Sequence, residues 1–243
     1  MVQKGLIPPA LVGKGVGGGP AFRRSETFFT NYEQHNSESL ILSKSEDSYI
    51  IGNRASHDIR LYSKDCDPMG TDKTAAAAGM SYMHLLIIPK KKVYNVVQLK
   101  DNEAIKEMID HFNKFWQRRD AAEKVNARIR LAMEEREKEV IRSLEKDADK
   151  KDAFEKVMQD VRGYAELCAA KLKELRVGEE GIVFRFHAGT DASIPHLHMH
   201  VLASPVEFRQ HSTLVHDRKA IPAAMVMEVI DAERSLPLSS QVL

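Results

Sequence analysis

The residues best suited to chemistry are three histidines at alternate positions. In the segment SIPHLHMHVLA, residues 193–203, single apolar residues separate His196, His198 and His200. Successive side chains of a strand point to opposite faces, so we expect the three imidazoles on one face at intervals of roughly 6 to 7 Å. Charged imidazoles at that spacing lower one another's pKa values. The pattern therefore predicts at least one neutral ring that can act as a nucleophile or a metal ligand.

Two kinds of site use such a row. Neutral imidazoles bind zinc, and alternate histidines can supply two or three ligands to one ion. Alternatively, one neutral histidine attacks phosphorus while its neighbours donate hydrogen bonds to the oxygens on which charge develops. A zinc site usually recruits a further Asp, Glu or Cys, which the motif lacks, whereas Gly189 and Ser193 just before it suit the approach to a phosphate. The sequence favours the phosphorus nucleophile and leaves a metal-dependent hydrolase as an alternative.

Hydrophobic patterning predicts the strands that position this row. Apolar and polar residues alternate through GIVFRFHAG, residues 181–189, which we expect to form the strand before the histidine segment. The apolar run in YMHLLIIPKKK, residues 82–92, predicts a buried strand that ends in a turn. Shorter strands are expected at 39–43 and 47–53, followed by a polar, irregular stretch over 54–74.

Three helices complete the expected elements. The first follows Asp101, a suitable capping residue, and repeats apolar side chains at three- and four-residue spacing as far as Trp116. The second carries the same periodicity from Phe154 to Leu175, and Pro222 begins a short last helix. The sequence therefore predicts a chain that contains both strands and helices.

Residues 118–152 differ from the rest because more than half of them are Arg, Lys, Asp or Glu. Val125, Ile129 and Met133 belong to a narrow apolar stripe, and oppositely charged residues four apart suit a solvated helix. We expect a charged helical insertion that is dispensable for chemistry. A docking or coiled-coil surface, including one for a homodimer, is the alternative.

The domain boundaries follow from composition. Residues 1–38 begin with a Gly- and Pro-rich stretch without hydrophobic periodicity and are expected to form a flexible arm. One domain is expected over 39–235, containing the insertion at 118–152, and 236–243 form a tail. A net charge of +1 gives no support for nucleic acid as a partner, although a local basic patch stays possible.

Composition also limits the cellular compartments and the cofactors that we expect. No run approaches the roughly 18 apolar residues of a membrane span, and the start lacks the apolar core of a secretory signal. We expect a cytoplasmic or nuclear protein with no membrane partner, while the basic arm leaves an organelle address open. Cys66 and Cys168 lie far apart, which disfavours a disulfide framework or a cysteine zinc site, and we expect no cofactor.

Two segments resemble a known family. His196-Leu197-His198-Met199-His200-Val201-Leu202 has the His-φ-His-φ-His-φ-φ form, with φ apolar, of the histidine triad superfamily of nucleotide hydrolases and transferases. His84-Leu85-Leu86-Ile87-Ile88-Pro89-Lys90 is similar to a second strand of that family, whose histidine lies beside the triad. The run FHAGTDASIPHLHMHV looks closest to the aprataxin-like or scavenger-decapping-like branches. However, no cysteine follows the triad to form the zinc finger of aprataxin.

The resemblance implies an α+β fold, with an antiparallel sheet, packed helices and, in this chain, a charged helical insertion. It also implies a mechanism and a role for each residue. His198 would attack the α-phosphorus of a nucleotide, with a purine base expected, and form a transient nucleotidyl-imidazole that water hydrolyses without a metal. His196 and His200 would orient it and stabilise phosphate oxygens, and Ser193 would contact the phosphate or protonate the leaving group. The nucleotide-binding residues implied by the resemblance and by the adjacent loop are His84, His187, Gly189 and Lys90. A nucleotide-binding adaptor with little turnover would keep the same pocket.

Overall fold

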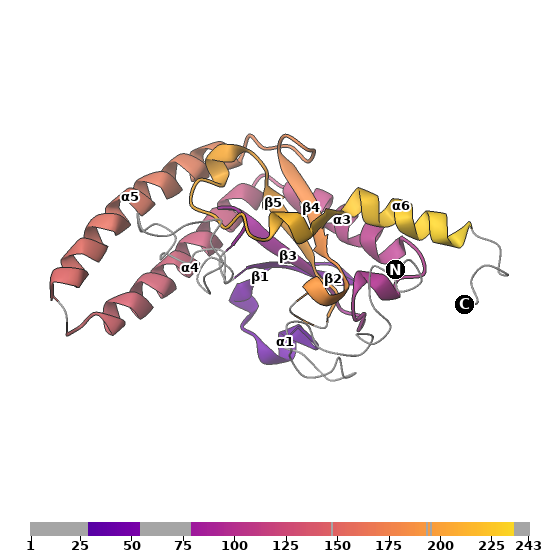
Figure 1. The fold of residues 1–243 in the computed structure, drawn as a ribbon, viewed down its shortest axis with the longest axis horizontal. Coiled ribbons are helices and arrows are strands. Elements are labelled where there is room, and N and C mark those ends of the chain that lie inside the picture. The colour runs from indigo at the N-terminus through magenta and orange to yellow at the C-terminus, as the bar shows by residue number, and fades with distance from the viewer. Residues whose placement is uncertain (1–28, 54–78, 147, 193, 195, 236–243) are drawn as a thin grey trace.

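A six-stranded antiparallel sheet forms the centre of the protein, in the order β1-β2-β3-β5-β4-β6 (Figure 1). The computed structural model describes residues 29–53, 79–146, 148–192, 194 and 196–235. The strands are β1 (Ile41–Lys44), β2 (Ser48–Gly52), β3 (His84–Pro89), β4 (Ile182–His187), β5 (Met199–Ala203) and β6 (Ala220–Pro222). The expected strands and their antiparallel pairing are confirmed, and the polar stretch at 54–74 lies outside the described residues.

Four long helices pack against one face of this sheet. They are α3 (Glu103–Trp116), α4 (Ala121–Ser143), α5 (Ala148–Leu172) and α6 (Ala223–Arg234), and the short α1 (Tyr32–His35) lies near the start of the described chain. The N-cap of α3 is Asn102, so the expected capping residue, Asp101, lies one position too early, although it accepts a hydrogen bond from the backbone N–H of Glu103 at 3.1 Å. Pro222 immediately precedes α6, as the sequence predicts.

The period-two pattern of the strands assigns their side chains alternately to the two faces of the sheet. Leu85 and Ile87 of β3 belong to the large core that the four helices cover. Leu86 and Ile88 point the other way, into a smaller cluster with Phe29 and the α1 region. Because side chains alternate along a strand, His84 shares the face of Leu86 and not the face that packs on the helices.

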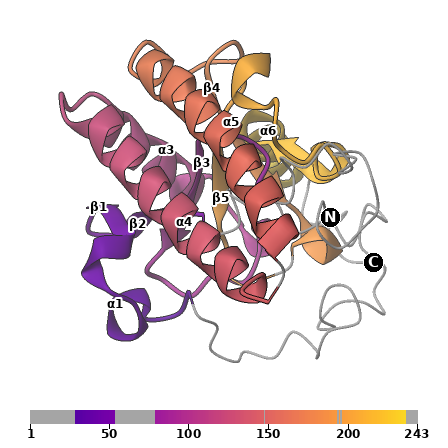
Figure 2. The same cartoon turned by 90° about the vertical axis from the view of Figure 1, so that its left-hand side faces the viewer.

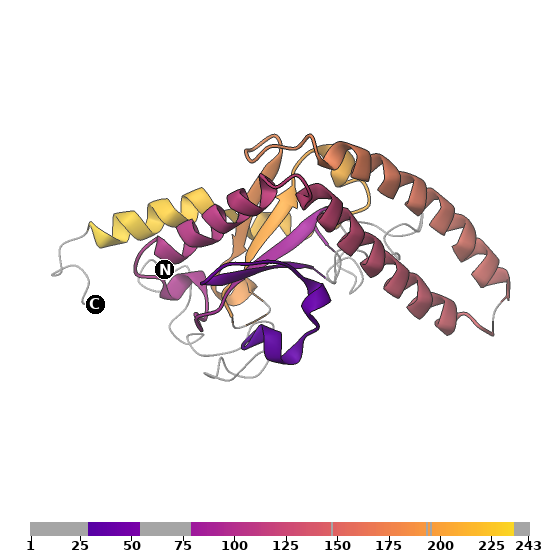
Figure 3. The same ribbon diagram turned by 180° about the vertical axis from the view of Figure 1, so that it is seen from behind.

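The charged segment forms most of a helical hairpin, and the prediction that it lies outside the core is wrong for its first half. Helices α4 and α5 run side by side away from the sheet (Figures 2 and 3). Val125, Ile129 and Met133 are buried in the same core as the sheet. A Cβ at Gly52 of β2 would lie 2.9 Å from Cγ of Arg128, so α4 packs closely on that strand. Even a narrow apolar stripe can bury one side of a helix in the core when the helix lies directly on a sheet.

The last part of the expected arm is also ordered against the sheet. Residues 1–28 lie outside the described residues, but Phe29 is 3% exposed and Tyr32 is 5% exposed. Tyr49 of β2 packs with Tyr32, and its hydroxyl donates to a carboxylate oxygen of Glu33 at 2.6 Å. Two aromatic side chains therefore anchor residues 29–38, which were expected to be flexible, to the face opposite the four long helices. None of the described helices is long and apolar enough to cross a membrane.

Candidate active site

The three alternate histidines lie at the start of β5, on the face opposite the four long helices. His200 is within β5, whereas His196 and His198 precede the strand, so the expectation of one continuous strand is wrong. The neighbouring strand β3 ends at Pro89. In the segment that follows it, the carbonyl of Val93 accepts a hydrogen bond from the backbone N–H of Leu197 at 2.7 Å. The three rings are nevertheless buried together, at 1%, 6% and 6% exposure for His196, His198 and His200.

The hydrogen bonds of His198 determine which of its nitrogens is free. Nδ1 lies 2.8 Å from the backbone carbonyl of His196, and a carbonyl only accepts, so Nδ1 carries the proton. In the neutral ring Nε2 therefore holds a lone pair, and it makes no hydrogen bond with a described residue. Phe29 contacts the ring edge-on, with centroids 5.5 Å apart. His198 thus has the tautomer of a nucleophile that attacks through Nε2.

His196 has a different arrangement. Its Nε2 lies 2.9 Å from the carbonyl of Pro89 and must donate a proton to it. Its Nδ1 is buried and has no hydrogen-bond partner among the described residues. A neutral His196 cannot donate to a phosphate oxygen through that lone pair. The geometry instead suits a positioning residue, which fixes the backbone carbonyl that holds His198.

A chain of donors defines the proton on His200. The backbone N–H of Met80 donates to Nδ1 of His84 at 3.2 Å, and the side-chain amide of Asn53 lies 3.0 Å from the same nitrogen. Nδ1 of His84 is therefore an acceptor, and its Nε2–H donates to Nδ1 of His200 at 2.8 Å. The remaining proton of neutral His200 is on Nε2, which is buried without a hydrogen-bond partner among the described residues. The Nε2–H of His200 is therefore a buried donor for which no described residue supplies an acceptor.

Burial lowers the pKa of every histidine in the row. For His196 and His198 burial is the largest cause, and their hydrogen bonds to backbone carbonyls partly oppose it. Burial also holds the pKa of His200 well below its usual value, followed by the charges of neighbouring histidines, of which His198 is the first. The expected lowering is confirmed, but loss of hydration, not mutual repulsion, is the main reason.

The end of β4 brings one further predicted residue, His187, to the row, and the loop that follows contains another, Gly189. The ring centroid of His187 lies 4.3 Å from that of His200, and its Nε2 is buried without a hydrogen-bond partner among the described residues. Gly189 follows with φ of 58°, a conformation that favours glycine. Asn95 accepts the backbone N–H of Gly189 at 3.0 Å and donates to its carbonyl at 3.4 Å. Asn95 thereby fixes the loop that follows His187.

The other two predicted residues have different outcomes. The ammonium of Lys90 lies 4.9 Å from the centroid of the Tyr49 ring, and it makes no hydrogen bond with a described histidine. The structure therefore does not bring Lys90 into the row. Ser193 lies outside the described residues.

Sequence reasoning missed several residues that surround the site. Arg185 is opposite His200 in the β4–β5 pairing, and its place two residues before His187 is the signal that could have found it. Asn53 and Asn95 carry no such signal, since they approach from distant segments. Lys219 is likewise far away in sequence, yet its charge helps to lower the pKa of His187.

The metal alternative finds little geometric support in the part of the chain that the structure describes. No three His, Cys, Asp or Glu side chains come together there as a group that could hold a metal ion. Each ring uses one nitrogen in a hydrogen bond, namely Nδ1 of His198, Nδ1 of His200 and Nε2 of His196, and the donor assigned to Nε2 of His200 cannot bind a metal ion. The nitrogens that remain belong to rings fixed by those bonds.

Comparison with protein-family models and with curated protein sequences finds no match. The resemblance to histidine triad proteins thus rests on the two sequence segments. The chemical roles of the site residues are inferred from their distances, burial and hydrogen bonds.

Proposed function

We propose that the protein is a nucleotidyl hydrolase or transferase. It cleaves at the α-phosphate of a nucleoside 5′-phosphate derivative through a covalent nucleotidyl-histidine intermediate. The observation that carries this proposal is the tautomer of His198, whose Nδ1 proton is held by a backbone carbonyl while its Nε2 lone pair has no described partner. The nucleotide as substrate comes from the resemblance of the two histidine segments to the histidine triad family.

In the first step, Nε2 of His198 attacks phosphorus. The N–P bond forms as the bond to the leaving group breaks, and the leaving group departs with the bonding pair. Negative charge grows on the non-bridging oxygens, and the unpartnered Nε2–H of His200 is the donor that can meet it. Water then attacks the same phosphorus, releases the nucleoside monophosphate and returns the electron pair to His198.

The surrounding residues keep this donor and this nucleophile in place. His84 directs the proton of His200 outward, while the carbonyl of His196 directs the lone pair of His198 outward. Buried neutral rings also avoid competition from protonation at neutral pH, because protonation of Nε2 would abolish attack. Ser193 stays a candidate for the proton that an amine leaving group requires.

The proposal is tested by trapping the covalent intermediate. The substrates are AMP-lysine, adenosine phosphoramidate, a diadenosine polyphosphate, a cap dinucleotide and adenylated DNA. The variants are His198→Asn and, as a matched control, His35→Asn at an exposed histidine of α1. We expect wild-type protein and His35→Asn to form an acid-labile, base-stable adduct. We expect His198→Asn to bind nucleotide but to turn over at least about 1000-fold more slowly.

Each rival function gives a different result. A nucleotide-binding adaptor would bind members of the panel without turnover in any variant. A metal-dependent hydrolase would contain stoichiometric metal, lose activity to a chelator and form no adduct. Near-normal turnover by His198→Asn would rule out the histidine nucleophile.

A further inference from the structure

A histidine outside the row has a serine hydroxyl at each of its ring nitrogens. His111 of α3 is 6% exposed. Its Nε2 lies 2.9 Å from Oγ of Ser43 in β1, and its Nδ1 lies 2.7 Å from Oγ of Ser48 in β2. Ser43 is half-buried, whereas Ser48 is completely buried. The two hydroxyl groups therefore differ in access, and only that of Ser43 can meet a molecule from solution.

A bulge in β1 turns Ser43 toward α3. Ile41 pairs with Ile51 and Ser43 with Ile50, so two steps along β1 correspond to one step along β2. Ile51 belongs to the cluster on the face opposite the long helices, whereas Ile50 belongs to the main core beneath them. Without the extra residue, Ser43 would share the face of Ile41 and point away from His111. The bulge therefore creates the contact between the hydroxyl and the imidazole.

The carboxylate of Glu107 sets the direction of the hydrogen bonds. Its Oε1 accepts from Ser45 at 2.6 Å and from Ser48 at 3.1 Å. If Ser48 did not donate to it, two lone pairs would face each other at that distance. Since its own hydrogen is on Glu107, Ser48 accepts from Nδ1–H of His111. Nε2 of the neutral ring then holds a lone pair that accepts the hydroxyl hydrogen of Ser43, which is the arrangement of an activated nucleophile and its base.

Ser43 and His111 line a hollow of about 630 Å³ between β1 and α3. Its volume is in the range of small-molecule sites. Among the described residues that line it, Phe115 is the one apolar side chain, and Lys106 and Lys114 bring ammonium groups. Burial is the largest cause that lowers the pKa of His111 to about 4, so the ring is neutral near pH 7 and free to take a proton. The hollow thus exposes a hydroxyl beside a neutral base to small polar molecules.

We propose that Ser43 is a nucleophile that cleaves small carboxylic esters, with His111 as its general base. Oγ of Ser43 attacks the carbonyl carbon while Nε2 of His111 takes the hydroxyl proton, and the carbonyl π pair moves onto oxygen. When that pair returns, the bond to the alcohol breaks, and His111 gives its proton to the departing oxygen. Water, deprotonated by the same nitrogen, then hydrolyses the acyl-serine. The ammonium groups of Lys106 and Lys114 line the same hollow as the oxygen that becomes negative.

This activity does not depend on the proposed nucleotide chemistry, because α3 and the histidine row are on opposite faces of the sheet. It is tested with p-nitrophenyl acetate, by the burst of p-nitrophenol and by mapping of the acetylated residue after acid quenching. We expect wild-type protein to show a burst and to carry acetyl-Ser43. Ser43→Ala should abolish both, and His111→Gln should slow the burst by about 100- to 10,000-fold. Ser39→Ala, at an exposed serine before β1, is the matched control and should behave as wild type.

Nitrogen NMR of the wild-type protein tests the base without any substitution, so the proposal stays open to refutation if His111→Gln fails to fold. We expect His111 protonated on Nδ1 at neutral pH. A ring protonated on Nε2, ester hydrolysis without acetyl-Ser43, or equal bursts in wild type and Ser43→Ala would each overturn the proposal. If Ser43→Ala lowers only the free energy of unfolding, Ser43 is merely a hydrogen-bond partner of His111. Nucleotide hydrolysis should be the same in wild type and Ser43→Ala, so failure of one activity leaves the other standing.

Discussion

The donor chain through His84 predicts that this residue controls the tautomer of His200. His84→Leu removes the N–H that faces Nδ1 of His200 and the acceptor for the backbone N–H of Met80. His84 is 4% exposed, so each buried group left without a partner destabilises the fold by about 1 to 3 kcal/mol. With two such groups, we expect the free energy of unfolding to fall by about 2 to 6 kcal/mol, so the assays must be run well below the unfolding temperature.

The catalytic effect is expected to exceed what this destabilisation explains. Without His84, the proton of His200 can occupy Nδ1, and the donor to the phosphate oxygens is then lost. One such oriented donor is commonly worth about 10- to 1000-fold in rate, so kcat of His84→Leu should fall within that range. His84→Gln, whose side-chain amide can donate to Nδ1 of His200, should lose less than about 10-fold.

Nitrogen NMR of the imidazoles provides a readout that a purely structural role of His84 would not change. In wild-type protein we expect His200 protonated on Nε2 and His198 on Nδ1. In His84→Leu, His200 should become a mixture of tautomers while His198 is unchanged. A wild-type His200 protonated on Nδ1, or a folded His84→Leu variant with kcat within twofold of wild type, would refute the reasoning.

Two further predictions concern stability. Burial first, and then the charges of Lys114 and Lys90, lower the pKa of His111 from 6.5 to about 4. As the pH falls, the unfolded chain therefore binds the proton before the folded protein does. Between pH 6.5 and 4 the free energy of unfolding should fall by about 3 kcal/mol because of His111, and this contribution should be absent in His111→Asn. Urea unfolding at several pH values measures the difference. In the hairpin, Ile129→Ala should destabilise by about 2 to 4 kcal/mol, whereas Leu131→Ala, at a residue 49% exposed, should stay within about 0.5 kcal/mol. Equal effects of the two hairpin variants in thermal unfolding would contradict the packing of α4.

The positions of β2 to β4 along the chain were predictable from sequence because alternation and apolar runs report burial directly. The β3 run from His84 and the β4 alternation to His187 each define which side chains share a face. The gathering of His84, His187 and His200 then requires only that their strands be neighbours in the sheet, which they are. Periodicity therefore predicts which side chains of β3 and β4 share a face.

Periodicity could not define what happens beyond the end of a strand. His196 and His198 alternate with His200 in sequence, yet their backbone leaves the ladder once Pro89 has ended the neighbouring strand. The tautomers were equally hidden, because they depend on a carbonyl of the same segment and on the backbone N–H of Met80. Hydrogen-bond partners of this kind have no spacing signal.

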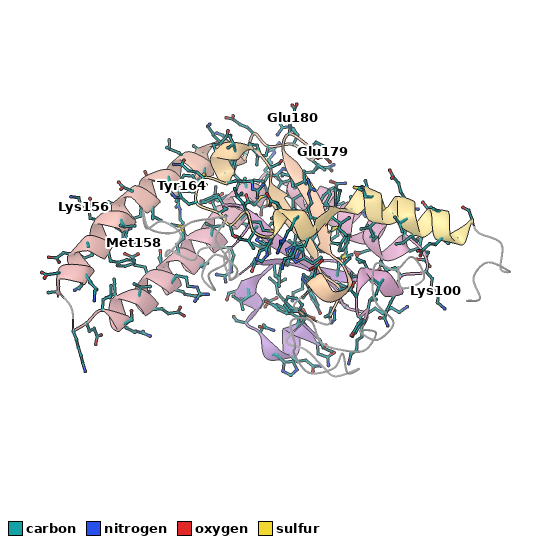
Figure 4. The ribbon with its side chains drawn as sticks, viewed as in Figure 1. Lys100, Lys156, Met158, Tyr164, Glu179 and Glu180 are labelled. Atoms are coloured by element: carbon teal, nitrogen blue, oxygen red, sulfur yellow. The ribbon has the colours of Figure 1, made fainter. Side chains whose placement is uncertain are left out.

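Charge balance misled the interpretation of the hairpin for a related reason. Counting ionic residues in 118–152 averages over a helix whose two halves differ in environment. Val125 and Ile129 are buried in the main core, and Met158 of α5 is buried on the side that faces α4 (Figure 4). A few well-placed apolar residues decide where a helix packs, while the charges only describe its solvent side.

The polar groups that the fold leaves unsatisfied define the ligand better than those it satisfies. Burying a donor without an acceptor is unfavourable, and a protein retains such a group where something else completes it. Nε2 of His200 and Nε2 of His187 are two such groups among the described residues. The two rings continue the row from His198, with ring centroids 5.0 Å apart for His198 and His200 and 4.3 Å apart for His200 and His187. In the proposed function the lone pair of His198 attacks an electrophile beside these rings. An anionic electrophile such as the α-phosphate of the proposed substrate would supply the acceptor that the Nε2–H of His200 lacks among the described residues.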